Sequence, residues 1–346
     1  MNSIISLSNI SVELNQKSIL KNISFSLAAG DILGLVGPSG CGKTTLLNTI
    51  AGFIKQAEGD IEYSNYPTIT KEQFLLPEHR QIGVIFQDYA LFPHLTVAKN
   101  IAFGIQHIDK VEQKERVGNL LTLLKIAPFA DRFPHQLSGG QQQRVAIARA
   151  LAPQTKLLLL DEPFSNIDAR LRNELMLELR VLLKQLNMTA IFVTHNKDEV
   201  FTFADKIAVL NEGEILQFGR PSDVCQLPNS WQVADFLQLG SWIPVTCDHG
   251  RLISVLGVLP TQPYNFAQAN LLVKPQDIEL NSKISANCEI NHINITEHGY
   301  HYMVSSLVKD SNLSFKRLSF YSQDLLSLGQ EVALTIKPHR CILFEK

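Results

Sequence analysis

The segment Asp31–Phe53, DILGLVGPSGCGKTTLLNTIAGF, predicts a short apolar strand, a glycine-rich loop and a helix. Residues 37–44, GPSGCGKT, match the phosphate-loop pattern G-x-x-x-x-G-K-[ST] in the setting that this motif requires. Glycine permits the backbone conformations that turn successive N–H groups toward a phosphate. We expect Lys43 to meet the β- and γ-phosphates of a nucleotide and the Thr44 hydroxyl to ligate Mg²⁺. The residues predicted to contact nucleotide are Gly37, Pro38, Ser39, Gly40, Cys41, Gly42, Lys43, Thr44 and Thr45.

Two adjacent acidic residues end a second apolar strand, in the sequence LLLLDEP at 157–163. Asp161 is placed to hold Mg²⁺, directly or through water. Glu162 is the candidate general base for the attacking water. An acid pair at a strand end can also simply cap a turn, but the phosphate loop upstream favours the catalytic interpretation.

Two further polar residues each follow an apolar strand. His195 ends IFVTH, and Gln87 follows GVIF. Since parallel sheets bind ligands at the carboxyl ends of their strands, His195 is predicted to donate a hydrogen bond to the γ-phosphate. Gln87 is predicted to reach water or Mg²⁺. Each signal is weak alone, because a single histidine at a strand end is more often structural than catalytic.

A second potential anion site begins at Leu137, in the sequence LSGGQQQR at 137–144. Its serine and glycines stand at the start of a predicted helix, where backbone N–H groups and the helix dipole attract anions. The chain already has a phosphate loop far upstream, so this second site requires an explanation.

Together the phosphate loop, the Gln87 loop, LSGGQ, LLLLDEP, SNID and His195 resemble the ATP-binding-cassette (ABC) family in order and spacing. The resemblance implies ATP and Mg²⁺ as cofactors and two cassettes paired head to tail, each ATP lying between the phosphate loop of one copy and LSGGQ of the other. It assigns a contact with the second copy's nucleotide to Ser138, Gly139, Gly140 and Gln141. Asp168, in SNID, would line the seam between the copies. Leu14 occupies the position where many relatives stack an aromatic residue on adenine, so we expect looser base selectivity.

The alternation of strands and helices up to about residue 240 predicts a parallel sheet with helices on its faces. The family resemblance implies an α/β fold for residues 1–239: a P-loop ATPase cassette with a mainly parallel sheet, an antiparallel β subdomain and a helical subdomain at about 88–155. Short strands separated by turn residues then predict a small β domain at 240–346. By resemblance this would be a β-barrel-like regulatory and dimerisation domain.

The composition is typical of an ordered globular protein with little net charge. The formal net charge of −2 gives no reason to expect nucleic-acid binding. The five cysteines have no paired spacing, as expected for free thiols in a reducing compartment. No apolar run approaches the ~20 residues of a spanning helix. We therefore expect a cytoplasmic protein, and the resemblance places it on the cytoplasmic face of the bacterial inner membrane, peripheral through a permease.

The resemblance also implies the partners. Single-cassette relatives with a C-terminal β domain are mostly importer subunits, so we expect a second copy, transmembrane permease subunits and, indirectly, a periplasmic solute-binding protein. Some apolar residues of the segment 88–105 are expected to pack the helical subdomain, and the apolar loop is predicted to form part of the docking groove for the permease. The apolar residues of the segment include Tyr89, Leu91, Phe92, Leu95 and Val97.

The C-terminal region carries the only hint about cargo. VADFLQLGSWIPV at 233–245, GVLP at 257–260 and LLVKPQDIEL at 271–280 resemble ferric-iron importer ATPases, which makes ferric iron the expected cargo. Importers of polyamine, sugar, sulfate or phosphonate remain open. A soluble ABC ATPase without a transport role is a remote alternative.

Overall fold

The computed structural model describes residues 3–63, 67–165, 167–260, 267–296, 299–308, 312–337 and 341–345. The chain forms two compact units, Met1–Gln226 and Leu227–Lys346. The sequence predicts the division at Gly240, and the first strand of the second unit begins at Ser241. The short helix α8 precedes that strand and belongs to the second unit.

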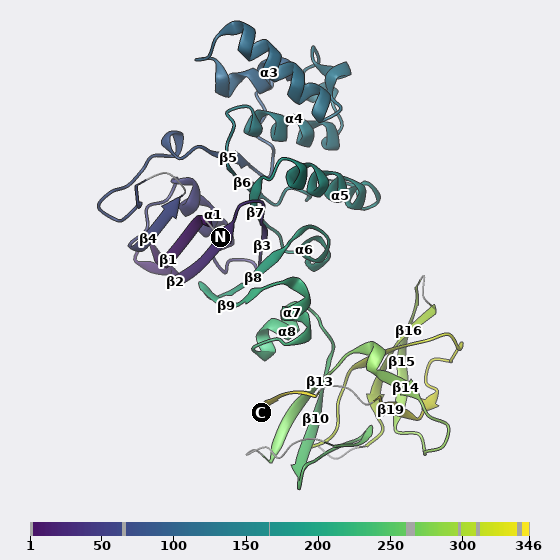
Figure 1. The fold of residues 1–346 in the computed structure, drawn as a ribbon. Helices are drawn as coiled ribbons and strands as arrows, with labels where there is room; N and C mark the ends of the chain where they lie inside the picture. Colours follow the sequence, from purple (N-terminus) through teal and green to yellow (C-terminus); the bar gives the residue numbers. More distant parts are fainter. Residues whose placement is uncertain are drawn as a thin grey trace. The chain divides into compact units, whose positions relative to one another are not determined.

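A six-stranded sheet organises the first unit, in the order β5-β6-β7-β3-β8-β9 (Figure 1). The first five strands are parallel and β9 is antiparallel. All five residues of β3 and all five of β7 are buried, as expected where both faces of a parallel sheet are covered. The sequence KIAVLNEGEILQFG at 206–219 predicts a hairpin with its turn at 211–213, and β8 and β9 confirm it. The strands are β3 (Ile32–Val36), β5 (Ile82–Ile85), β6 (Leu157–Asp161), β7 (Thr189–Val193), β8 (Lys206–Asn211) and β9 (Glu214–Gly219).

A separate antiparallel sheet has the order β2-β1-β4, formed by β1 (Ser3–Leu14), β2 (Lys17–Ala28) and β4 (Glu58–Tyr63). Two alternating segments at the start of the chain, with NQK at 15–17 between them, predict a hairpin, and β1 and β2 confirm it. Asn15 and Gln16 form its two-residue turn, with φ of 49° and 62°. Two left-handed residues are what a type I′ hairpin requires.

Helix α1 (Lys43–Ala51) shares one buried core with residues of both sheets. Leu46, Leu47 and Ile50 are almost completely buried in it. The carboxyl end of α1 is closed by Arg80, whose guanidinium donates to the carbonyls of Thr49 and Ile50, each at 2.8 Å. The helix that starts at the phosphate loop is therefore held at both ends and along its length.

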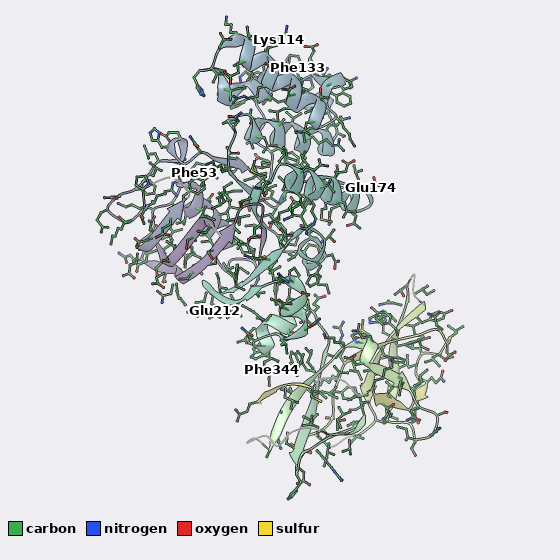
Figure 2. All side chains as sticks on the ribbon, in the orientation of Figure 1. Phe53, Lys114, Phe133, Glu174, Glu212 and Phe344 are labelled. Atoms are coloured by element: carbon green, nitrogen blue, oxygen red, sulfur yellow. The ribbon has the colours of Figure 1, made fainter. Side chains whose placement is uncertain are left out.

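The remaining helices of the first unit cover the sheet and build a helical subdomain from α2, α3 and α4 (Figure 1). The sequence RVGNLLTLLKI at 116–126 predicts a helix with one apolar stripe at Val117, Leu120, Leu121 and Leu124. On and just after α3 this stripe is buried except for half-buried Leu120, whereas charged residues such as Lys114 project to solvent (Figure 2). Across the described residues, none of the helices combines the length and apolar character needed to cross a bilayer. The helices are α2 (Val97–Ala102), α3 (Lys110–Leu123), α4 (Gly139–Leu151), α5 (Ala169–Gln185), α6 (Lys197–Phe203) and α7 (Pro221–Gln226), with α8 (Trp231–Phe236) in the second unit.

The second unit contains antiparallel sheets in the orders β12-β11-β10-β13-β20, β17-β16-β15-β18 and β14-β19. Their inner faces share one core, which includes Ile243, Leu271, Tyr302 and Phe320. Because this core is separate from that of the first unit, the β domain has its own source of stability. The strands are β10 (Ser241–Asp248), β11 (Arg251–Ser254), β12 (Gly257–Pro260), β13 (Gln268–Val273), β14 (Ile278–Leu280), β15 (Cys288–Thr296), β16 (Gly299–Ser306), β17 (Leu318–Ser322), β18 (Glu331–Val332), β19 (Leu334–Ile336) and β20 (Ile342–Glu345).

Removing the Arg80 guanidinium should destabilise the first unit. Arg80 is 1% exposed and also donates to the carbonyl of Leu75, so Arg80→Met leaves three carbonyls without this donor. We expect a loss of about 3 kcal/mol in the free energy of unfolding, since buried polar groups that lose their partners are costly. Denaturant unfolding measures this. The exposed Arg251→Met serves as control, and equal midpoints for the two variants would contradict the assigned role.

Candidate functional site

The phosphate loop, residues 37–44, leads from β3 into α1. Gly42 has φ of 107°, and a Cβ there would lie 2.7 Å from the Leu20 side chain. At Gly37 a Cβ would lie 2.1 Å from the carbonyl oxygen of Leu210. Both positions therefore require glycine. The loop folds over Lys43, whose ammonium donates to the carbonyls of Gly37 and Pro38, each at 2.8 Å.

A cavity of about 360 Å³ opens above this loop. Ser39, Gly40, Gly42, Lys43, Thr44 and Thr45 line it from the loop and α1, and Ile19, Glu162, Val193 and His195 complete it. Backbone N–H groups at a helix start, a lysine and the hydroxyls of Ser39, Thr44 and Thr45 are the kind of donor set that a polyphosphate requires. The residues present therefore fit a nucleotide triphosphate.

Thr44 and Asp161 face each other across the floor of the site. The Thr44 hydroxyl donates to Asp161 Oδ1 at 3.4 Å. Burial raises the pKa of Asp161, and the neighbouring Glu162 charge raises it further, while Thr44 and Lys43 oppose the shift. A hydroxyl beside a half-buried carboxylate suits Mg²⁺, so these two residues would hold the ion. When bound, Mg²⁺ neutralises charge on the β- and γ-phosphate oxygens.

Glu162 lies at the centre of the predicted catalytic residues. Gln87 Nε2 donates to its Oε2 at 3.4 Å, and His195 Nδ1 lies 3.2 Å from its Oε1. The backbone of Glu162 is left-handed, with φ of 44°, and its N–H donates to the carbonyl of Val193 at 3.1 Å. Such a backbone costs of order 1 kcal/mol or more and is common at functional sites. The structure thus brings together three residues that the sequence identified separately.

The turn after Gln87 is held by Arg149 of α4. Tyr89 and Ala90 are both left-handed, and the Arg149 guanidinium donates to both of their carbonyls. Burial lowers the pKa of Arg149, and Asp88 partly offsets this. The Gln87 loop is therefore fixed to α4, the helix that begins at the LSGGQ sequence.

The LSGGQ sequence forms the start of α4. Ser138 is the N-cap: its hydroxyl accepts from the N–H of Gln141, and its own N–H donates to Gln141 Oε1 at 3.0 Å. Gly140 is buried, and a Cβ there would lie 3.1 Å from the Leu175 side chain of α5. α4 therefore packs closely on α5 at this glycine, which the sequence did not indicate.

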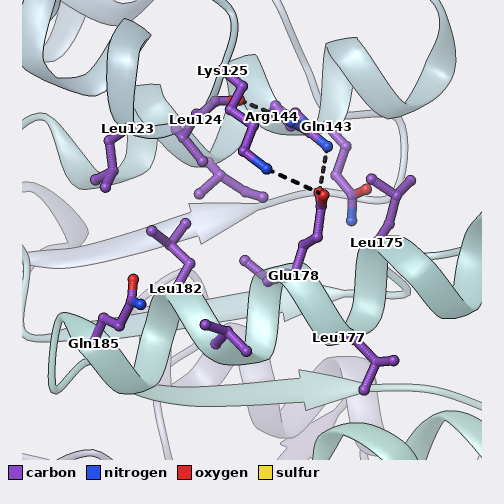
Figure 3. A pocket seen from close by; sticks show the side chains of 13 residues that line it. Leu123, Leu124, Lys125, Gln143, Arg144, Leu175, Leu177, Glu178, Leu182 and Gln185 are labelled. Carbon is purple, nitrogen blue, oxygen red and sulfur yellow. Dashed lines mark hydrogen bonds and ion pairs between the residues drawn. The ribbon is translucent and has the colours of Figure 1, made fainter.

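An apolar cavity of about 460 Å³ lies between α4 and α5, away from the phosphate loop (Figure 3). Glu178 of α5 crosses it, pairing with Arg144 and lying 3.6 Å from Lys125 (Figure 3). The contact between the helical subdomain and α5 is thus incompletely packed, although charge pairs bridge it.

Three other predicted site residues are not among those that line the nucleotide cavity. Cys41 is 6% exposed, with Sγ 3.8 Å from the ammonium of Lys43 beneath the loop. Asp168 is exposed immediately before α5. Leu14, at the end of β1, is not among the residues that line the nucleotide cavity, so its base contact stays a prediction. Ile19 does line that cavity and was missed, since its position in β2 gives no sequence signal.

A family model described as ABC transporter matches residues 20–165. The chain is 42% identical over 285 residues to "Fe(3+) ions import ATP-binding protein FbpC 2" of Haemophilus influenzae, covering 81% of this chain and 80% of that protein. It belongs to the ABC transporter family.

Two other similarities extend this result. "Spermidine/putrescine import ATP-binding protein PotA" of Pseudomonas fluorescens is 37% identical to this ABC protein over 343 residues, covering 94% of this chain and 93% of that one. The solved ATP-binding cassette MJ0796, a dimer bound to ADP and Pi, matches with a TM-score of 0.54 and 31% identity. It covers 62% of this chain and 98% of that cassette. The predicted fold class and the need for ATP with Mg²⁺ are thereby confirmed.

Changing Glu162→Gln should preserve ATP binding and slow hydrolysis. The amide keeps the size of the side chain but cannot accept a proton from water, so we expect turnover to fall by about 10²- to 10⁴-fold, the usual contribution of a general base. Phosphate release and binding of a fluorescent ATP analogue measure the two effects. Turnover within twofold of the unmodified protein would show that another group acts as the base.

Proposed function

We propose that this chain is the ATP-hydrolysing subunit of a bacterial importer and works as a head-to-tail pair of copies. One observation carries the proposal: the nucleotide cavity is lined by the phosphate loop, Glu162 and His195, but not by the LSGGQ residues of the same chain. Ser138 is exposed and half-buried Gly139 follows it at the start of α4. A second copy can bring its own Ser138 and α4 onto the open side of the cavity.

Pairing of this kind accounts for both phosphate-binding motifs. The first loop would hold the triphosphate through Lys43 and backbone N–H groups. The second helix start would add donors to the γ-phosphate and exclude water, where electrostatic stabilisation is most effective. Glu162 would then take a proton from the attacking water, with Gln87 and His195 orienting its carboxylate. The MJ0796 cassette, itself dimeric with ADP and Pi, supports the arrangement.

A permease would dock beside the Gln87 loop. Tyr89 and Val97 of the segment 88–105 are 3% and 0% exposed and pack the helical subdomain. Phe103 of the same segment is 46% exposed. Two further exposed apolar residues lie outside the segment: Phe53 (Figure 2) is 52% exposed and Phe86 is 37% exposed, and their ring centres lie 6.0 Å apart. Docking there would place the chain at the cytoplasmic face of the inner membrane, and the permease would link it to a solute-binding protein.

Ferric iron is the first candidate cargo. A curated relative with an Fe(3+) import name is 42% identical over 285 residues. Spermidine or putrescine is the second candidate, and one observation favours it: the PotA similarity runs over 94% of this chain and so includes the β domain. In either case iron or polyamine would be the transported substrate, with no contact to the ATPase site.

Changing Ser138→Arg should stop hydrolysis while leaving nucleotide binding to the single copy nearly intact. The arginine would fill the helix start that the second copy's phosphate needs, but it lies outside the chain's own cavity. Phosphate release and ATP-analogue binding are measured on the same preparation. Normal turnover by the variant would show that LSGGQ lies outside the active site of the pair.

The cargo is tested in vesicles that contain the chain together with the permease subunits that copurify with it. We expect ATP-dependent uptake of ⁵⁵Fe(III) with the partner binding protein, and none with the Glu162→Gln subunit. Uptake of labelled spermidine without ⁵⁵Fe would replace iron by polyamine as the cargo. ATP hydrolysis with neither uptake would reject both candidates.

A further inference from the structure

Glu199 is a buried carboxylate close in sequence to the exposed residue His195 of the candidate site. It is 4% exposed, in the first turn of α6, although His195 lies only four residues earlier. The Thr194 hydroxyl donates to Glu199 Oε2 at 2.6 Å, and Arg172 Nη1 lies 3.8 Å from Oε1. Burial raises the pKa of Glu199, and Thr194 and Arg172 counteract this. Neither Glu199 nor Arg172 contacts the nucleotide cavity.

Arg172 connects this carboxylate to the loop before α5. Its Nη2 donates to the carbonyl of Ile167 at 3.1 Å, and its backbone N–H donates to the carbonyl of Asp168 at 2.9 Å. The guanidinium therefore spans from the Asp168 loop to the first turn of α6. A shift of Ile167 would be transmitted to Glu199 through one rigid planar group.

Glu199 in turn fixes the residues around His195. The Thr194 hydroxyl that donates to Glu199 also accepts from the N–H of Asn196 at 2.9 Å. These bonds hold the chain on both sides of His195, whose ring contacts Glu162. A cavity of about 80 Å³ lies among these groups, lined by Glu162, Ser165, Arg172, Thr194, His195, Asn196 and Glu199. Glu162 and the Arg172–Glu199 pair thus line the same small cavity.

An ion pair with one buried and one partly exposed member adds little net stability, because desolvation of the carboxylate offsets much of the attraction. The effect of this pair is therefore chiefly to fix geometry. We propose that Arg172 and Glu199 are positioning residues that couple the Asp168 loop to His195 and Glu162. This inference rests on the proposed function, since Asp168 meets a second copy only if the cassettes pair. Contact at the seam would then set the alignment of the catalytic base.

The test is a double-mutant cycle on the full-length chain, with kcat and KM for ATP measured for Arg172→Met, Glu199→Gln and the double variant. Both single changes break the same link, so each should lower kcat by about 3- to 30-fold, the range reported for residues that carry coupling between sites. KM should change by less than about twofold, because neither side chain lines the nucleotide cavity. The double variant should have nearly the kcat of the worse single variant.

Arg180→Met provides a matched control for simple loss of stability. Arg180 lies on the same helix and pairs with Asp205 at 2.7 Å, with a side-chain exposure of 29% against 25% for Arg172. We expect it to lower Tm without lowering kcat. A control that loses kcat as Arg172→Met does, a double variant whose losses multiply, or a rise in KM equal to the fall in kcat would each overturn the proposal.

ATP-driven pairing separates this inference from the proposed function. In the Glu162→Gln background, size-exclusion chromatography with ATP should show dimers both with and without Arg172→Met, because the pair is proposed to align the base and not to hold the copies together. Absence of dimers from the Glu162→Gln chain alone would reject the proposed function. Dimers lost only on adding Arg172→Met would reject the positioning role alone.

Discussion

Four neighbouring parallel strands, β5-β6-β7-β3, end at one edge of the sheet, and the whole site depends on this register. Gln87 follows β5, Asp161 and Glu162 end β6, and His195 follows β7. The phosphate loop follows β3. Because the strands are paired in parallel with no register shift between β6 and β7, residues separated by 33, 75 and 117 positions meet within hydrogen-bond distance. A change in strand order would disperse them.

The site also requires a rigid support for the residues that would bind phosphate. α1 is embedded between two sheets and closed by Arg80, so Lys43 and Thr44 project from a helix that cannot easily shift. Preorganised donors cost no reorganisation when negative charge arrives. The contact between α4 and α5 is different, since it includes an apolar cavity bridged by Arg144 and Glu178. Rigid phosphate binding and a looser helical subdomain therefore coexist in one unit.

The sequence predicted the strands that end at the site and the polar residues that follow them, because short linear motifs encode both. It also predicted the parallel sheet, the hairpins and the second β unit from periodicity and turn residues. It did not predict the contacts made between elements distant in sequence: Arg80 on the end of α1, Gly140 against Leu175, or Arg172 with Glu199. The apolar character of these residues in the sequence likewise could not show that Tyr89 and Val97 are buried and that Phe53 is exposed. Such distinctions depend on packing, which a single sequence does not record.

The left-handed backbone at Glu162 affects which residues this position tolerates. Aspartate, asparagine and glycine all tolerate this conformation better than glutamate does. Asparagine or glycine at this position would keep the turn and the strand end but would remove the carboxylate that is proposed to act as the base. In a pair of unequal copies, a copy with such a substitution would bind nucleotide without hydrolysing it.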